Sequence, residues 1–92
     1  MKVDSPEAKD ELNRRLRRIE GQVRGVQKMV DDGRDCKEIV QQLVAIRSAV
    51  QGASQTFMQS VASECLLNLD PQNPAARSAA VSDLISLLGK TA

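Results

Sequence analysis

The chain has 92 residues, of which 41% are apolar and 27% charged, with a formal net charge of +1 and no histidine. A single aromatic residue argues against a single-strand nucleic-acid binder, since such proteins stack bases on aromatic rings. No apolar run is long enough to span a membrane, and the start of the chain, MKVDSPEAKDE, lacks the apolar core of a signal peptide, so we expect a cytoplasmic protein.

A chain of this size predicts one small helical domain over residues 1–92. The first helix is predicted over residues 6–32, with Ser5 as N-cap, Pro6 at the first helical position and Gly33 as C-cap. Apolar residues recur along it at spacings of three and four, which is typical of an amphipathic helix with a continuous apolar seam: Leu12, Leu16, Ile19, Val23, Val26 and Val30.

The second helix is predicted over residues 36–68, well above the usual helix length. Asp35 followed by Glu38 resembles a capping box, and the prolines of LDPQNP end the helix. Its seam continues through Ile39, Leu43, Ile46, Val50, Ala53, Phe57 and Val61. A third helix is predicted over residues 74–89, ended by Gly89.

The two long seams indicate the fold class and the assembly. A simple hairpin cannot bury both seams, and a small chain has little interior of its own. We therefore predict an all-α, three-helix protomer whose hairpin packs against that of a second copy as an antiparallel four-helix bundle.

The only two cysteines, Cys36 and Cys65, lie 29 residues apart on the second predicted helix. At about 1.5 Å per residue they are roughly 43 Å apart within one chain. An antiparallel partner helix that crosses near Val50 and Gln51 would place Cys36 of one chain beside Cys65 of the other, and Gly52 would permit close approach. Because cytoplasmic thiols are normally reduced, such a pair favours metal binding or redox sensing over a structural disulfide.

Cys36 is the candidate first nucleophile, and Cys65 the candidate resolving thiol. Cys36 lies in the first turn of its helix, where the helix dipole favours the thiolate, although Asp35 opposes this effect and Lys37 supports it. Cys65 lies in an apolar run beside Glu64. The alternative is that both cysteines are inert core residues, because free cysteine is among the most buried residue types.

Six basic residues lie along the first predicted helix: Arg14, Arg15, Arg17, Arg18, Arg24 and Lys28. On a helical wheel all of these except Arg15 cluster roughly opposite the apolar seam, which predicts a basic exposed face. Such a face is either a solvated surface or a contact for the phosphates of double-stranded DNA, and arginine suits phosphate geometry.

The segment LNRRLRRIEGQVRGVQKMVDDGRDCKEIVQQLVAIRSAV resembles the N-terminal two-thirds of the copper-sensitive operon repressor family. The basic helix, the RIEGQVRG run and the spacing of Cys36 and Cys65 carry the resemblance, which continues into the third helix. Members of this family are all-α bacterial repressors, dimers of dimers that release DNA on binding an inducer. The resemblance implies a homotetramer, operator binding by the six basic residues of the first helix, and pairing of Cys36 with Cys65 of another subunit.

The sequence departs from the copper-sensing pattern of this family at Val61. Copper sensors carry a histidine there, one turn before the second cysteine, so their trigonal Cu(I) site with two sulfur ligands and one nitrogen ligand cannot form in this chain. The nickel and cobalt sensors need several nitrogen ligands, and the formaldehyde sensors use an N-terminal proline where this chain has Lys2. The resemblance therefore points to the thiol-only branch, whose members sense persulfides and polysulfides without a metal or other cofactor.

We expect a transcriptional repressor that releases operator DNA when a persulfide or polysulfide donor modifies or cross-links Cys36 and Cys65 of neighbouring subunits. One alternative is a Cu(I)-responsive repressor, since soft Cu(I) can bind two thiolates linearly. A second alternative is a structural helical DNA-binding protein with inert cysteines. An enzyme is not expected, because the sequence carries no candidate general base, metal triad or phosphate-binding loop.

Overall fold

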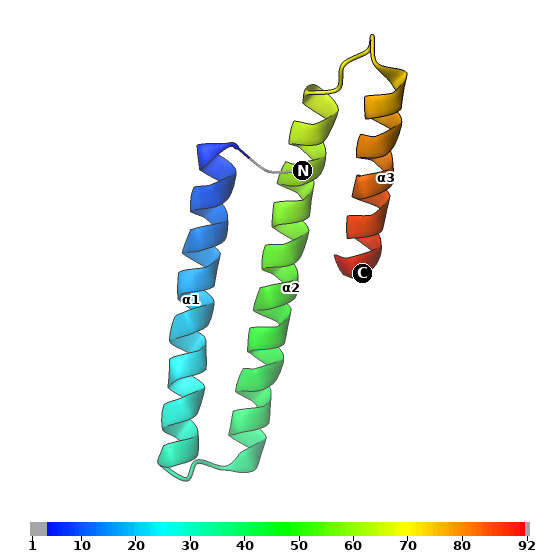
Figure 1. The fold of residues 1–92 in the computed structure, drawn as a ribbon. Coiled ribbons are helices and arrows are strands. Elements are labelled where there is room, and N and C mark those ends of the chain that lie inside the picture. The colour runs from blue at the N-terminus through cyan, green and yellow to red at the C-terminus, as the bar shows by residue number, and fades with distance from the viewer. Residues whose placement is uncertain (1–3, 92) are drawn as a thin grey trace.

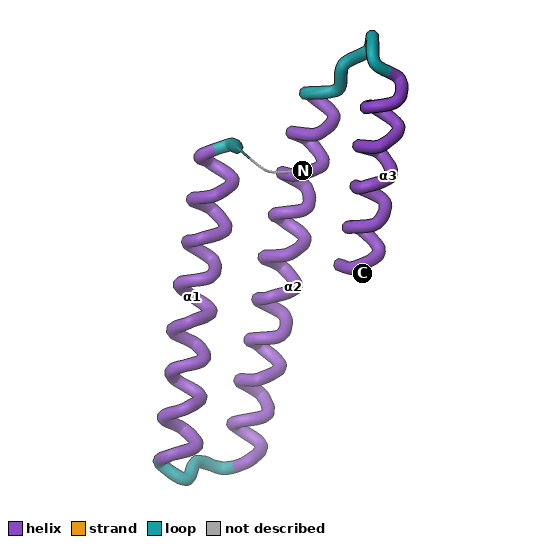
Figure 2. Tube along the Cα trace, in the orientation of Figure 1, coloured by secondary structure: helices purple, strands orange, loops and turns teal. Residues whose placement is uncertain are grey.

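The computed structural model describes residues 4–91, which form three α-helices joined by short loops and contain no strand (Figures 1 and 2). Helix α1 spans Pro6–Asp31, α2 spans Cys36–Leu67 and α3 spans Pro74–Thr91. The predicted all-α, three-helix protomer is confirmed, and its assembly with further copies stays a prediction.

Helix α1 begins and ends at the caps that the sequence indicates. The backbone N–H of Ala8 donates to the Ser5 hydroxyl oxygen over 3.3 Å, and Pro6 occupies the first turn. At the other end Gly33 adopts a φ of +68°, and the N–H of Arg34 donates to the carbonyl of Met29 over 3.0 Å. These are the features of a Schellman motif, which reverses the chain tightly enough for α2 to return along α1.

Two details of the helix ends differ from the prediction. Asp35 caps α2 by accepting from the N–H of Lys37, but Glu38 does not complete a capping box, because its carboxylate pairs with Arg34 at 2.8 Å. A guanidinium is a stronger partner for a carboxylate than a backbone N–H. Gly89 does not end α3, which continues to Thr91. Among the described residues only Gly33 has a positive φ, so Gly89 does not adopt the left-handed conformation of a glycine C-cap.

The three helices lie side by side in a single layer. Helices α1 and α2 form an antiparallel hairpin, and α3 packs along the C-terminal half of α2 on the side away from α1 (Figure 1). The protomer measures 61 × 25 × 13 Å and has a radius of gyration of 17.9 Å. A compact chain of this length has a radius of gyration of about 12 Å, so the protomer is elongated and has little interior.

The buried core is correspondingly small. Its main cluster consists of Met58, Val61 and Leu84, where α3 meets α2. Many large apolar side chains of the described residues are exposed instead: Leu16, Val23, Val30, Val40, Leu43, Val44, Val50, Leu66, Leu67, Val81, Ile85 and Leu88. None of the helices in the described part of the chain is long and apolar enough to cross a membrane.

Candidate functional site

The two thiols lie at opposite ends of α2 and do not meet within a protomer. Helix α2 runs without interruption for 32 residues, with Cys36 as its first residue and Cys65 in its last turn. At about 1.5 Å per residue the two cysteines are roughly 43 Å apart along the helix. Both are free thiols, Cys36 exposed and Cys65 half-buried.

The thiols nevertheless share one face of α2. Their separation of 29 residues is about eight turns at 3.6 residues per turn, so both side chains leave the helix in nearly the same direction. Leu43 and Val50 follow Cys36 at heptad spacing on this face and are 51% and 47% exposed. We call the surface formed by Cys36, Leu43, Val50 and Cys65 the thiol face. A partner that covers its apolar residues would also approach both thiols.

Cys65 opens into a cleft between the end of α2 and α3. The cleft has a volume of about 270 Å³ and is lined by Val61, Glu64, Cys65 and, from α3, Arg77. Cys65 packs against the main apolar cluster, in which Val61 is only 5% exposed. The residue one turn before Cys65 is therefore a buried hydrocarbon side chain that offers no metal ligand. Within the described residues, no group of three or more His, Cys, Asp or Glu side chains is placed to hold a metal ion.

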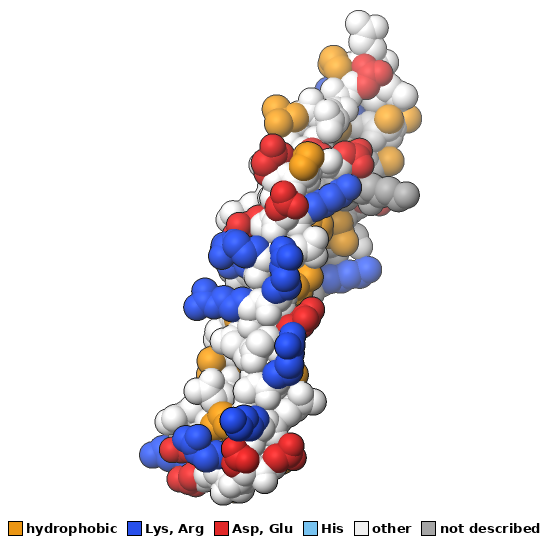
Figure 3. All heavy atoms as spheres, turned by 90° about the vertical axis from the view of Figure 1, so that its left-hand side faces the viewer, with side chains coloured by type: hydrophobic (Ala, Val, Ile, Leu, Met, Phe, Trp, Pro, Cys, Tyr) orange, Lys and Arg blue, Asp and Glu red, His pale blue; other side chains and the backbone are white. Residues whose placement is uncertain are grey.

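Basic side chains gather over the middle of the α1 side of the molecule (Figure 3). Two of them are held by a shared carboxylate, because Glu11 accepts from Arg14 at 2.7 Å and from Arg15 at 2.9 Å. The hydrogen bond from Arg14, and then that from Arg15, lowers the pKa of the Glu11 carboxyl below its usual value. Glu20 pairs with Arg24 at 3.4 Å. Among the described residues, the basic side chains of α1 that form no ion pair from Arg14 onward are Arg17, Arg18 and Lys28.

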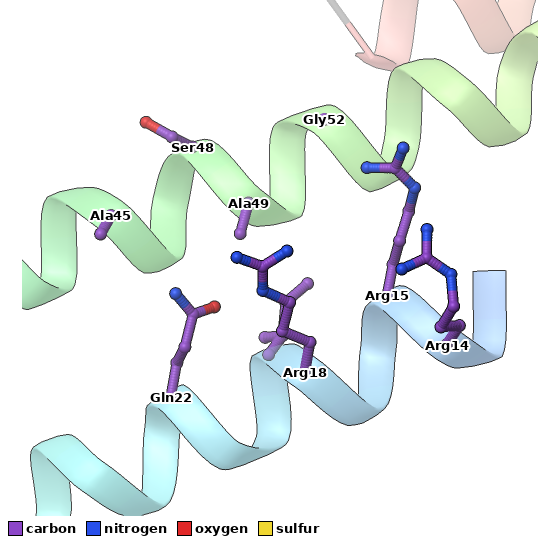
Figure 4. A pocket seen from close by; sticks show the side chains of 9 residues that line it. Arg14, Arg15, Arg18, Gln22, Ala45, Ser48, Ala49 and Gly52 are labelled. Atoms are coloured by element: carbon purple, nitrogen blue, oxygen red, sulfur yellow. The ribbon is translucent and has the colours of Figure 1, made fainter. Parts of the chain in front are cut away.

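Part of this basic surface is a groove between α1 and α2. It has a volume of about 440 Å³ and is lined on the α1 side by Arg14, Arg15, Arg18, Ile19 and Gln22. Figure 4 shows Arg15, Arg18 and Gln22 extending toward α2. On α2 the groove is lined by small residues that leave room for these long side chains: Ala45, Ser48, Ala49 and Gly52. We call it the arginine groove.

The arginine groove adds a detail to the predicted basic face. Arg14 and Arg18 are exposed, as the helical wheel predicts, and both also line the groove beside α2. Helix α2 covers only one edge of the apolar seam, and Leu16 and Val23 on the other edge are 42% and 41% exposed. The hairpin is therefore apolar on one side of the contact between α1 and α2 and lined by arginines on the other side.

The sequence pattern did not indicate two polar contacts of this structure. The first is the pairing of Glu11 with Arg14 and Arg15, which the spacings of three and four residues could have revealed. The second joins the ends of the hairpin, because the Glu64 carboxylate accepts from the N–H of Asp4 at 3.0 Å and of Ser5 at 2.9 Å. No local pattern reveals a contact between residues 60 positions apart.

Residues 8–90 match the model of a protein family described as metal-sensitive transcriptional repressors. The chain belongs to this family. It is 34% identical over 86 residues to the copper-sensing transcriptional repressor CsoR of Bacillus subtilis, a match that covers 94% of the chain and 83% of that relative. The family resemblance found in the sequence is thereby confirmed.

Solved structures of two other regulators share the fold. A variant of the formaldehyde-responsive regulator FrmR from Salmonella enterica serovar Typhimurium superposes with a TM-score of 0.82 at 28% identity, over 97% of this chain and 99% of that one. The nickel-responsive transcriptional regulator InrS superposes with a TM-score of 0.77 at 26% identity, over 100% and 98% of the two chains. The named inducers of these relatives differ, so family membership identifies a transcriptional repressor and leaves its inducer a prediction.

Proposed function

We propose that this repressor binds operator DNA as a dimer of dimers and releases it when a persulfide or polysulfide joins Cys36 to Cys65 of a neighbouring subunit. The observation that carries the proposal is the placement of both thiols at the two ends of one face of an unbroken α2. In an antiparallel pair of α2 helices, a two-fold axis near Val50 would bring Cys36 of each chain to Cys65 of the other. The exposed apolar residues of the thiol face supply the contact for such a pair.

The proposed chemistry is thiol exchange with a sulfane sulfur donor. The Cys36 thiolate attacks the outer sulfur of a persulfide, RSSH, to give Cys36–SSH and expel RS⁻. The Cys65 thiolate of the other chain then attacks the inner sulfur, forming the disulfide and expelling HS⁻. The donor's sulfane sulfur is the oxidant and leaves as sulfide, so no other oxidant is needed. Intact mass spectrometry after treatment with glutathione persulfide tests this sequence of species.

Cu(I) is the second candidate inducer, and one observation favours it. CsoR of Bacillus subtilis, 34% identical to this chain, is named as copper-sensing. The donor set of this chain partly fits, because Cys36 and Cys65 of two subunits could supply two thiolates to a soft ion. The buried side chain of Val61 supplies no third ligand. We therefore place Cu(I) second to sulfur donors.

The basic residues of α1 are proposed to contact operator phosphates. Arg18→Ala is expected to weaken binding to an operator duplex, selected by the reduced protein from a random pool, by roughly tenfold to a hundredfold, because a charge-assisted hydrogen bond contributes about 1.5–3 kcal/mol. Each lost phosphate contact should also reduce the slope of log affinity against log salt by roughly one. Arg14→Ala should have a smaller effect, since Glu11 already occupies that guanidinium.

Fluorescence anisotropy over a salt series measures both quantities. Lys90→Ala, which removes the same charge from the far end of α3, is the matched control and should bind as the parent does. Unchanged affinity and slope in the Arg18 and Arg14 variants would mean that the basic surface is solvated and does not contact DNA phosphates.

Glu11 is proposed to compete with phosphate for two arginines. Glu11→Gln should tighten operator binding by roughly threefold to tenfold, because it frees Arg14 and Arg15 and removes a negative charge beside the DNA. The salt dependence should steepen at the same time. Asp83→Asn on α3 removes a carboxylate at a distance from α1 and serves as control. Equal affinities for the Glu11→Gln variant and the parent protein would mean that the arginine groove does not face DNA.

A further inference from the structure

The start of α1 is joined to α2 by one side chain, Glu64. Its Oε1 accepts from the backbone N–H of Asp4 at 3.0 Å and of Ser5 at 2.9 Å. The other side-chain hydrogen bonds between described residues join positions at most four apart. Glu64 therefore provides the polar link between the entrance of α1 and the far end of α2.

Along the rest of their contact, α1 and α2 meet through apolar side chains. Leu12 and Ile19 of α1 and Ile46 of α2 are half-buried, and Ala8 and Ala53 are buried. Apolar contacts are not directional, and packed helices can shift past one another by about 1–2 Å. A directional hydrogen-bonded link at one end would fix a position that these contacts do not.

Glu64 contributes little to the free energy of unfolding, although its side chain is partly buried. Its Oε2 is buried and accepts no hydrogen bond from the described residues. A buried acceptor without a partner costs free energy and offsets what the two bonds to Oε1 contribute. The carboxylate does lie at the positive end of the α1 dipole, which favours it in this place. Loss of Glu64 should therefore change the placement of α1 more than the free energy of unfolding.

We propose that Glu64 is a positioning residue that couples the Cys65 end of α2 to the DNA-binding helix. It precedes Cys65 directly in α2, and the residues it holds precede α1, which carries the arginine groove. In the reduced protein the link sets the position of α1 on α2 that fits DNA. A change at Cys65 moves the last turns of α2 and breaks the link. The effect of a change at Cys65 rests on the proposed function, whereas the positioning of α1 by Glu64 requires only that the protein is a DNA-binding repressor.

The first experiment uses the reduced full-length protein and the selected operator duplex. Glu64→Ala should weaken binding at least tenfold and speed amide hydrogen exchange in the first turn of α1. Glu64→Gln keeps an acceptor oxygen and should stay within threefold of the parent. Asp4→Pro removes one donor from the other end of the link, leaves α2 unchanged, and should weaken binding in the same direction. Glu38→Ala, which removes an α2 carboxylate paired only with Arg34, is the control.

Two results would overturn the proposal. One is parental affinity and parental amide exchange in Glu64→Ala. The other is equal loss of affinity in Glu64→Ala and Glu64→Gln, which would mean that the charge acts and the hydrogen bonds do not. Because Asp4→Pro leaves α2 intact, it keeps the test valid if Glu64→Ala folds poorly.

The second experiment measures coupling between the thiol and DNA. Intact mass spectrometry should show that the donor modifies Cys36 and Cys65 in Glu64→Ala as it does in the parent. The ratio of the DNA affinities before and after treatment should be at least fivefold smaller in Glu64→Ala than in the parent. A purely structural role would lower both affinities and keep their ratio, which would contradict coupling. If the donor fails to release the parent protein from DNA, the proposed inducer is wrong, and the reduced-protein experiment still decides the role of Glu64.

Discussion

Treatment of the reduced protein with glutathione persulfide should link subunits through Cys36 and Cys65 and lower operator affinity by roughly a hundredfold, toward the upper range of measured allosteric couplings. The reason is geometric. The link ties the first residue of one α2 to the last turn of another, and Cys65 lies directly beside the residue that holds α1. Anisotropy measures release, and a non-reducing gel with intact mass measures the link.

Single cysteine variants separate the two chemical steps. Cys36→Ala should abolish release and the cross-link, because the first nucleophile is lost. Cys65→Ala should stop at a persulfidated, unlinked protein with a mass gain of one sulfur atom. Hydrogen peroxide or sulfide alone should act poorly on the parent, since neither transfers a sulfane sulfur.

The same experiment distinguishes sulfur from copper. Release of DNA by the donor without a cross-link and without a mass gain would contradict the sulfur proposal. Release by buffered Cu(I) at sub-nanomolar free metal would then support the copper alternative. Val61→His restores the nitrogen ligand of the copper-sensing pattern and should strengthen the response to Cu(I), although it places a polar ring beside Leu84 in the apolar cluster. If neither the sulfur donor nor Cu(I) releases DNA from the parent protein or from Val61→His, the alternative of inert cysteines is favoured.

The helices of this protein were predictable because their signals are local. Ser5, Pro6 and Gly33 act within one turn, and the apolar spacing of α1 and α2 follows directly from 3.6 residues per turn. Gly89 shows the limit of such signals. A glycine permits a left-handed turn without requiring one, so the same residue type ends α1 and is carried within α3.

The parts of the candidate site that depend on how the helices meet were less predictable. A helical wheel gives the direction of Arg18 around its own helix but not which edge of the seam α2 covers, and this edge decides whether Arg18 lies in the groove. The link from Glu64 to Asp4 and Ser5 joins distant positions through backbone N–H groups, which carry no sequence signal. The thiol face, in contrast, follows from a spacing of 29 residues on one unbroken helix.

The apolar residues of the thiol face should hold the subunits together, and Val50→Asp should separate them. Val50 is 47% exposed in the protomer and lies midway between the two cysteines. Burial of an unpaired carboxylate there would cost several kcal/mol, so the dissociation constant of the assembly should rise more than a hundredfold. Analytical ultracentrifugation at micromolar concentration should show an oligomer for the parent and a smaller species for Val50→Asp.

Gln55→Asp adds the same charge to an exposed position on another side of α2 and should leave the assembly intact. A folded monomer of the parent protein, or an intact oligomer of Val50→Asp, would contradict the antiparallel pairing of α2. The variant also tests the sensing geometry. Within one protomer the thiols are roughly 43 Å apart, so donor-treated Val50→Asp should gain sulfur on Cys36 and form no cross-link. A cross-link in a monomeric species would require α2 to break, and the unbroken helix from Cys36 to Leu67 argues against that.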